Sequence, residues 1–118
     1  MDTVVPADIL GVQVAEHGPD TRIVTVTGEL DALTAPALAA VLTETVAAAQ
    51  LVVVNLDGVH YLASAGLQVL IEAHQLATEQ GGDLRLVCHS SGANRVLDGS
   101  GLREHFIFAD SVALALSQ

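Results

Sequence analysis

The sequence predicts a single α/β domain built on a mixed sheet, and three observations favour this class. Strand-like and helix-like segments alternate along most of the chain, which is typical of helices layered on a sheet. The run Leu51–Leu56 is apolar on both faces, as expected for a central strand. A short turn joins the first two predicted strands, so we expect that pair to be antiparallel and the sheet to be mixed.

The first predicted elements form a β-hairpin. Val12 and Val14 alternate with polar neighbours, and Ile23–Val26 follow a turn at His17–Asp20. We expect Gly28 to end the second strand of this hairpin.

A helix is predicted next, with Thr34 as its N-terminal cap and Pro36 in its first turn. Its inner face repeats at helical spacing and consists of Leu38, Val41, Leu42, Thr45 and Ala49. This helix leads into the central strand, which we expect to end at Leu56.

A second helix is predicted from Ser64 to the stop signal Gly81-Gly82. Asp83–Cys88 then resumes an extended pattern. The inner face of this helix is predicted to hold Leu67, Leu70, Ile71 and His74.

The last part of the chain contains two short predicted helices around a short strand. Ser90 or Ser91 can cap the first helix, which would end at Gly99–Gly101. Phe106–Phe108 is predicted as the strand, and Asp110 as the cap of a terminal helix.

Length and composition indicate one globular domain. The chain has 118 residues, of which 51% are hydrophobic and 15% are charged. We expect a flexible lead-in over residues 1–10 and a single domain over 11–118. Its apolar runs are too short to span a bilayer and its N-terminus lacks a signal-peptide pattern, so a cytoplasmic location without membrane insertion is expected.

Charge and residue types argue against several functions. The formal charge of −10, with four Arg and no Lys, makes binding to nucleic acid unfavourable and excludes a Walker-type loop or a Schiff-base lysine. Five dispersed histidines and the single Cys88 predict no metal site, cofactor or disulfide. Leu62 replaces a glycine of the hydrolase elbow around Ser64, so we expect no enzyme.

Ser64 lies between the predicted central strand and the following helix, where it would either cap the helix or act as a switch. The first N–H groups of a helix lack partners there, so an oxygen acceptor or a phosphate is favourable. Small neighbours, Ala63, Ala65 and Gly66, would let a partner approach the hydroxyl.

Glu29-Leu30-Asp31 forms a second compact signal at the end of a predicted strand. It is either a solvated turn or a recognition loop, because no third ligand or activated nucleophile is near in sequence. If the two strands are neighbours, this loop and Ser64 share one edge of the sheet, with Asp31 within reach of Ser64.

Four separated motifs together resemble the STAS-domain anti-sigma factor antagonists of bacteria. They are Gly28–Asp31, Asn55–Val59, Ser64–Leu67 and Leu97–Leu102, and the resemblance covers about residues 11–117. It implies a mixed sheet with helices packed on one side and a phosphorylated serine at the position of Ser64. The residues expected to bind the partner are Glu29, Leu30, Asp31, Leu62, Ala63, Ser64, Ala65, Gly66 and Leu67.

The resemblance implies partner switching. Unphosphorylated, the chain would bind an anti-sigma factor with a kinase fold and free its sigma factor. That kinase would modify Ser64 to end the interaction, and a serine phosphatase would restore it.

The sequence departs from the family pattern Asp-Ser-Ser/Thr-Gly, because Ala63 and Ala65 flank Ser64. A constitutive antagonist that is never phosphorylated therefore stays open. A STAS subunit of a membrane transport ATPase is another alternative, and neighbouring genes would distinguish the two.

Overall fold

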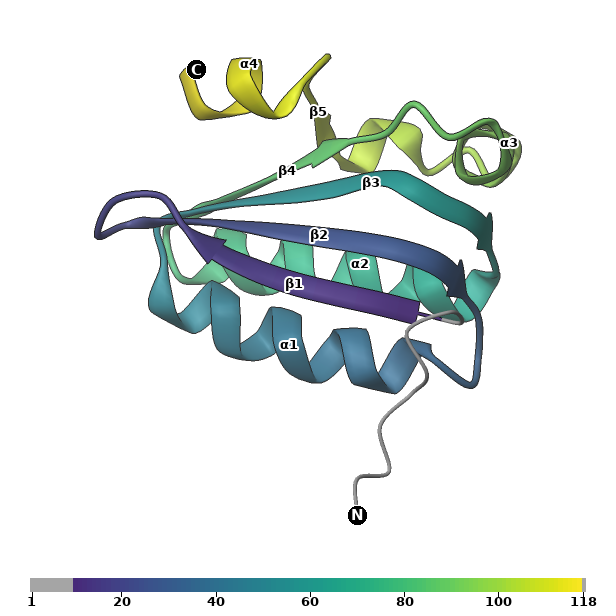
Figure 1. The fold of residues 1–118 in the computed structure, drawn as a ribbon, viewed down its shortest axis with the longest axis horizontal. Helices are drawn as coiled ribbons and strands as arrows, with labels where there is room; N and C mark the ends of the chain where they lie inside the picture. The colour runs from purple at the N-terminus through teal and green to yellow at the C-terminus, as the bar shows by residue number, and fades with distance from the viewer. Residues whose placement is uncertain (1–9, 118) are drawn as a thin grey trace.

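A computed structural model describes residues 10–117 as a five-stranded sheet with four α-helices (Figure 1). The elements are β1 (Leu10–Glu16), β2 (Thr21–Leu30), α1 (Ala35–Ala48), β3 (Leu51–Leu62), α2 (Ser64–Glu79), β4 (Asp83–Val87), α3 (Ser91–Gly99), η1 (Arg103–His105, a 3₁₀ turn), β5 (Ile107–Phe108) and α4 (Val112–Ser117). The predicted lead-in lies outside the described residues, apart from Leu10, which is buried in β1.

The sheet has the order β1-β2-β3-β4-β5 and is mixed, as predicted. β1 pairs antiparallel with β2, whereas the other neighbours are parallel. Parallel neighbours need a crossover connection, and α1 and α2 supply it between β2, β3 and β4. The predicted central strand is confirmed, because β3 lies third of five.

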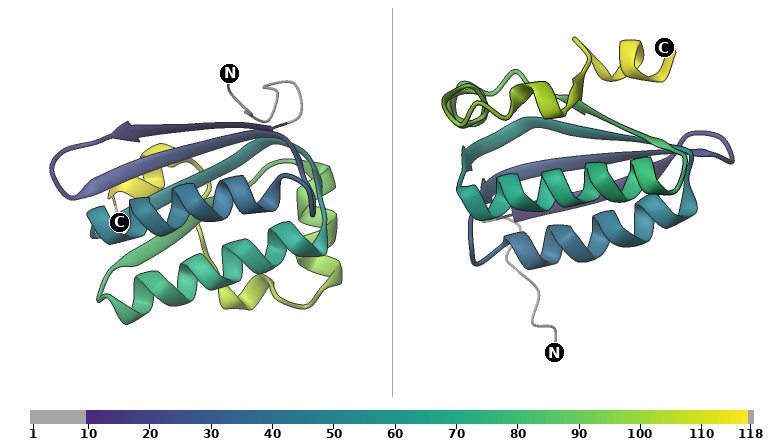
Figure 2. Two further views of the ribbon diagram at one scale, coloured as in Figure 1. Left: turned by 90° about the horizontal axis from the view of Figure 1, so that it is seen from below. Right: turned by 180° about the vertical axis from the view of Figure 1, so that it is seen from behind.

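The sheet is covered on both faces, unequally. The two long helices α1 and α2 lie side by side on one face, as the resemblance implies, while α4 lies on the opposite side (Figures 1 and 2). The alternation of β3 explains this arrangement. Val52 and Val54 belong to the core cluster under α1 and α2, whereas Val53 packs with Ala115 of α4. A strand that is apolar on both faces requires cover on both.

β3 continues to Leu62, six residues beyond the predicted end at Leu56. Asp57 and Gly58 resemble a turn in sequence, but pairing with β2 continues through a register shift, and Thr27 lies opposite Gly58. A Cβ at Gly58 would come within 2.7 Å of the Thr27 methyl carbon, so glycine permits this close pairing.

β2 likewise continues to Leu30 instead of ending at Gly28. Gly28 has a φ of 99°, and the register shifts again between Gly28 and Glu29. The positive φ favours glycine and bends the strand without ending it. The two extended strands therefore finish side by side, with Leu30 opposite Leu62.

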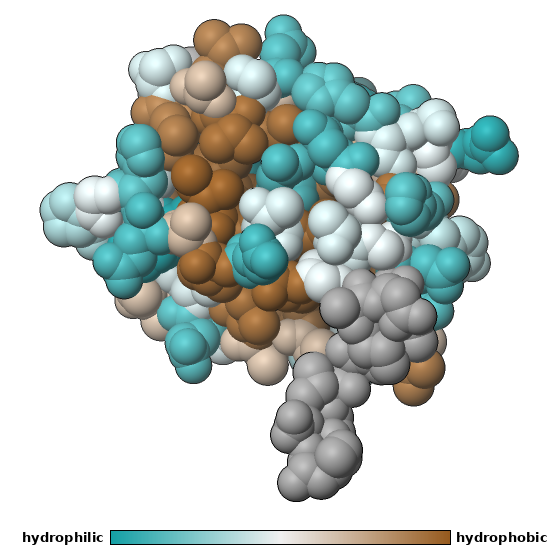
Figure 3. Space-filling view, in the orientation of Figure 1, coloured by the Kyte–Doolittle hydropathy of each residue, from teal (hydrophilic) through white to brown (hydrophobic). Residues whose placement is uncertain are grey.

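Hydrophobic surface in the view of Figure 3 gathers in a band that runs from α4 across the sheet toward α1. Below the surface, a second core cluster joins α4 to the sheet through Val53, Val87 and Ala115, which are buried. Within residues 10–117, no helix combines the length and the apolar character that crossing a bilayer would require.

Candidate functional site

Ser64 is the first residue of α2 and is exposed to solvent. The N-cap is Ala63, whose backbone is extended (φ −95°, ψ 169°) and whose carbonyl accepts hydrogen bonds from the N–H groups of Gly66 and Leu67. Of the two predicted roles of Ser64, helix cap or switch, the structure excludes the cap, because a residue inside the first turn is not the cap. The role as a switch stays a prediction.

The Ser64 hydroxyl makes no side-chain hydrogen bond to any of residues 10–117, and the helix has no side-chain cap. Within the described chain, no side-chain hydrogen bond would have to break before the Ser64 oxygen could be phosphorylated. The positive end of the helix dipole favours a negative group at this position. A phosphate on Ser64 is thus compatible with the fold.

The loop Asp31–Thr34 approaches the same edge and is tied by its own side chains. The Asp31 Oδ1 accepts hydrogen bonds from the N–H groups of Leu33 (3.0 Å) and Thr34 (3.1 Å). The buried Thr34 hydroxyl donates to the Glu29 carbonyl (2.9 Å) and accepts from the Asp31 N–H (2.9 Å). Thr34 is the N-cap of α1, as predicted, but its hydroxyl binds back into the loop rather than to the helix.

One backbone hydrogen bond joins this loop to the start of α2. The Ala63 N–H donates to the Leu30 carbonyl over 2.8 Å. A Cβ on Gly66 would lie 2.5 Å from Leu30 Cγ and 2.9 Å from Leu62 Cδ1, so α2 contacts the two strand ends closely. The two loops share an edge, while the Asp31 carboxylate is turned into its own loop.

The sequence profile of the STAS domain matches residues 13–115. The chain belongs to the STAS domain family.

Solved structures similar to this STAS domain include anti-sigma factor antagonists. One from Mycobacterium paratuberculosis is 27% identical, covers 97% of each chain and has a TM-score of 0.83. SpoIIAA in its unphosphorylated form is 18% identical over 91% of this chain and 94% of that chain, with a TM-score of 0.77. The phosphorylated form of SpoIIAA from Bacillus is 18% identical over 91% of this chain and 97% of that chain, with a TM-score of 0.70. No curated protein sequence matches the chain.

The nine residues predicted to bind a partner divide into two groups in the STAS domain. The buried group lies beneath the surface of the edge and comprises Leu30, Leu62, Gly66 and Leu67. These four residues are buried in the domain, and their role in partner binding stays a prediction. The accessible group comprises Glu29 and Ser64, which are exposed, and Asp31, Ala63 and Ala65, which are half-buried.

Sequence reasoning missed two large apolar side chains at this edge. Leu33 is 78% exposed and Tyr61 is 54% exposed. Strand alternation could have found Tyr61, because its neighbour Leu62 points into the core. Leu33 follows no periodic pattern, so its exposure becomes evident only from the path of the loop.

Three segments of the STAS domain that frame Ser64 carry no arginine or lysine. They are α1, α2 and the loop between β2 and α1. Arg85 and Arg103 are engaged elsewhere, with the Ala115 carbonyl (2.7 Å) and the Asp98 carboxylate (3.3 Å) respectively. A negative charge added at Ser64 would therefore meet no arginine from these three segments.

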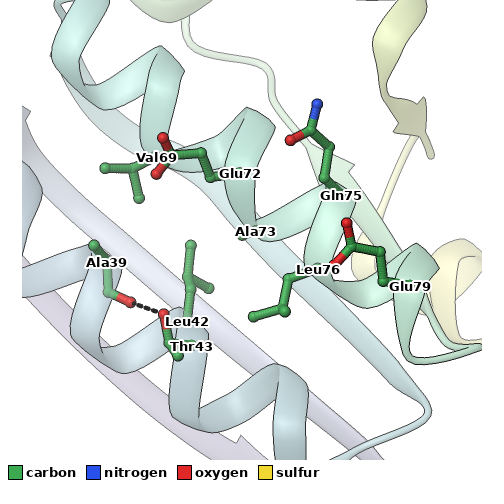
Figure 4. Close-up of a pocket in the computed structure, with 9 residues that line it drawn as sticks. All are labelled: Ala39, Leu42, Thr43, Val69, Glu72, Ala73, Gln75, Leu76 and Glu79. Atoms are coloured by element: carbon green, nitrogen blue, oxygen red, sulfur yellow. Dashed lines mark hydrogen bonds between the residues drawn. The ribbon is translucent and has the colours of Figure 1, made fainter.

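A groove of about 270 Å³ lies between α1 and α2, away from the tip of α2 that carries Ser64 (Figure 4). Its lining residues are Ala39, Leu42, Thr43, Val69, Glu72, Ala73, Gln75, Leu76 and Glu79. Its only charged groups are the carboxylates of Glu72 and Glu79, so it is unsuited to a phosphate.

Possible metal ligands and the single thiol, Cys88, lie within the described residues. Among residues 10–117, no three His, Cys, Asp or Glu side chains cluster so as to hold a metal ion. Burial raises the pKa of the Cys88 thiol, and a raised pKa disfavours the reactive thiolate.

Proposed function

We propose that this STAS domain is an anti-sigma factor antagonist of the cytoplasm whose binding is controlled by phosphorylation of Ser64. Unphosphorylated, it binds an anti-sigma factor with serine kinase activity and thereby frees a sigma factor. The kinase modifies Ser64, and a serine phosphatase reverses the modification. The role is regulatory and needs no catalytic group, metal or cofactor on this chain.

The observation that carries this proposal is the exposed Ser64 hydroxyl at the first position of α2, which makes no side-chain hydrogen bond within residues 10–117. A kinase must reach the oxygen of its substrate, and the flanking Ala63 and Ala65 leave it uncovered. The similarity to a solved anti-sigma factor antagonist at 27% identity supports the same conclusion.

Elementary electrostatics supplies the switch. A phosphate adds roughly −1.5 to −2 charges at neutral pH. Within an interface these charges must lose water or meet new cations, and either requirement weakens binding. The chain's own charge of −10 adds to the repulsion from any acidic group on the partner.

Phosphorylation is tested by incubating the purified chain with ATP, Mg²⁺ and each kinase-fold anti-sigma factor of the genome that encodes it. We expect one phosphate per chain, located at Ser64 by mass spectrometry, and none on Ser64→Ala. Ser111→Ala, which alters a serine before α4, serves as the matched control and is expected to be modified like the native chain. Binding without any modification at Ser64 would contradict phosphoregulation.

A constitutive antagonist is the second candidate, and the two alanines beside Ser64 favour it. The family pattern implied by the resemblance has a carboxylate before the serine and a hydroxyl after it, and both are absent here. Under this alternative the chain binds the anti-sigma factor through the same edge and stays unmodified. The phosphorylation assay separates the two candidates directly.

A further inference from the structure

Leu33 is the most exposed large hydrophobic side chain of residues 10–117, at 78% against 54% for Tyr61. A single exposed leucine is ordinary on a protein surface and needs no explanation by itself. Leu33 differs because several hydrogen bonds hold the loop around it, although its side chain makes no contribution to the core.

Hydrogen bonds fix the loop on both sides of Leu33. Its own N–H donates to Asp31 Oδ1 (3.0 Å), and the next N–H, from Thr34, donates to the same oxygen (3.1 Å). The completely buried Thr34 hydroxyl bridges to the Glu29 carbonyl (2.9 Å). The backbone of such a loop loses little conformational freedom when it binds, so only the Leu33 side chain has to be immobilised.

The loop is also continuous with the edge that carries Ser64. It follows Leu30 directly, and the Leu30 carbonyl accepts the Ala63 N–H over 2.8 Å. The charge nearest in sequence to Leu33 is that of Asp31, whose Oδ1 is already occupied by donors of the loop. Leu33 itself offers only apolar area to a partner, so its contact is apolar, whereas ion pairs at this edge would have to come from Glu29 or Asp31.

We propose that Leu33 is an affinity anchor that enters an uncharged, apolar pocket on the anti-sigma factor. This inference rests on the proposed function. It assigns the affinity for the partner and the control of that affinity to different residues. Leu33 supplies binding affinity by burying apolar surface, whereas Ser64 supplies control by gaining charge. Loss of Leu33 weakens the complex whether or not Ser64 can be phosphorylated.

The test measures the affinity of native and variant chains for the anti-sigma factor that the native chain binds, by isothermal titration calorimetry. We expect Leu33→Ala to weaken binding at least tenfold. Leu33→Met preserves an apolar side chain of similar volume and is expected to stay within about threefold of the native affinity.

Leu114→Ala provides the matched control. Leu114 is an exposed leucine (45%) on α4, which covers the other face of the sheet. This variant is expected to bind within about twofold of the native chain, because surface substitutions outside an interface change little. Leu33→Ala, Leu33→Met and Leu114→Ala should all keep the native melting temperature. A change in affinity then cannot be due to loss of folded protein.

Two failures are distinguishable. If the native chain binds but Leu33→Ala binds equally well, the anchor is overturned and the proposed function stands. If the native chain binds none of the kinase-fold anti-sigma factors, the proposed function fails and the anchor fails with it.

Discussion

The backbone N–H of Ala63 donates a 2.8 Å hydrogen bond to the carbonyl oxygen of Leu30. This bond connects the last residue before α2 with the last residue of β2, across two strand ends that are already paired. Ser64 and the loop after Leu30 are therefore parts of one structural unit. Substitutions that disturb the contacts beneath this unit should affect both stability and binding.

Gly66→Ala should lower the stability of the domain. A methyl group at Gly66 would lie 2.5 Å from Leu30 Cγ, in a tightly packed part of the core. Alanine ordinarily stabilises a helix relative to glycine by about 1 kcal/mol, but overpacking costs about 1–3 kcal/mol. We expect a net loss of up to about 2 kcal/mol in the free energy of unfolding, measured by urea denaturation.

Gly99→Ala is the control for this substitution. Gly99 is also helical, at the end of α3, and a Cβ there meets no atom within 4 Å. This variant should be as stable as the native chain or more stable, by up to about 1 kcal/mol. If Gly66→Ala and Gly99→Ala changed the free energy of unfolding equally, contact with Leu30 would not restrict the size of the side chain at position 66.

Thr34→Val should destabilise the loop that presents Leu33. The substitution keeps the shape of the side chain but removes a buried hydroxyl that bonds to the Glu29 carbonyl and the Asp31 N–H. Leaving buried groups without partners costs about 1–3 kcal/mol. Differential scanning calorimetry should show a lower melting temperature.

Thr43→Val removes the same hydroxyl from an exposed position on α1, where it donates only to the Ala39 carbonyl (2.8 Å). We expect a change within about 0.5 kcal/mol. If Thr34→Val proved equally mild, the ordered state of the loop would not depend on the Thr34 hydroxyl.

The order of the elements could be predicted from the sequence because their signals are local. The apolar run at Leu51–Leu56 identifies the central strand, and Gly81-Gly82 marks the stop after α2. Ser90 and Ser91 were both possible caps of α3, and the structure selects Ser90, whose Oγ accepts a hydrogen bond from the Ala93 N–H (3.2 Å). Signals of this kind need no knowledge of distant residues.

Features that depend on tertiary contacts could not be predicted. The continuation of β3 through Asp57 and Gly58 is decided by pairing with β2, which overrides their preference for turns. The cap predicted at Asp110 was wrong, because Ser111 Oγ instead accepts the Leu114 N–H (3.1 Å). The outward position of Leu33 depends on loop hydrogen bonds that no local pattern encodes.

Cys88 should react slowly with thiol reagents in the folded domain. Its side chain is buried, and burial raises its pKa from the ordinary value of 9.0. At about pH 8 we expect labelling by Ellman's reagent to be at least tenfold slower in the native chain than in urea. Equal rates would contradict the burial of the thiol.

The same pKa predicts how stability depends on pH. The folded thiol ionises at higher pH than the unfolded thiol, so the unfolded state loses its proton first. The contribution of Cys88 is therefore fully present below pH 9.0 and declines as the pH rises above that value. Urea denaturation at each pH gives the free energy of unfolding of both chains. Between about pH 8 and pH 10 this free energy should fall less for Cys88→Ala than for the native chain.

The central claim is that an uncharged Ser64 permits docking and a charged one prevents it. The most direct measurement compares the affinities of the native chain, Ser64→Ala and Ser64→Asp for the anti-sigma factor, with Ser111→Asp as a control that adds the same charge beside α4. We predict that Ser64→Ala and Ser111→Asp bind within about twofold of the native chain, and that Ser64→Asp binds at least tenfold more weakly. Native affinity for Ser64→Asp would contradict the claim.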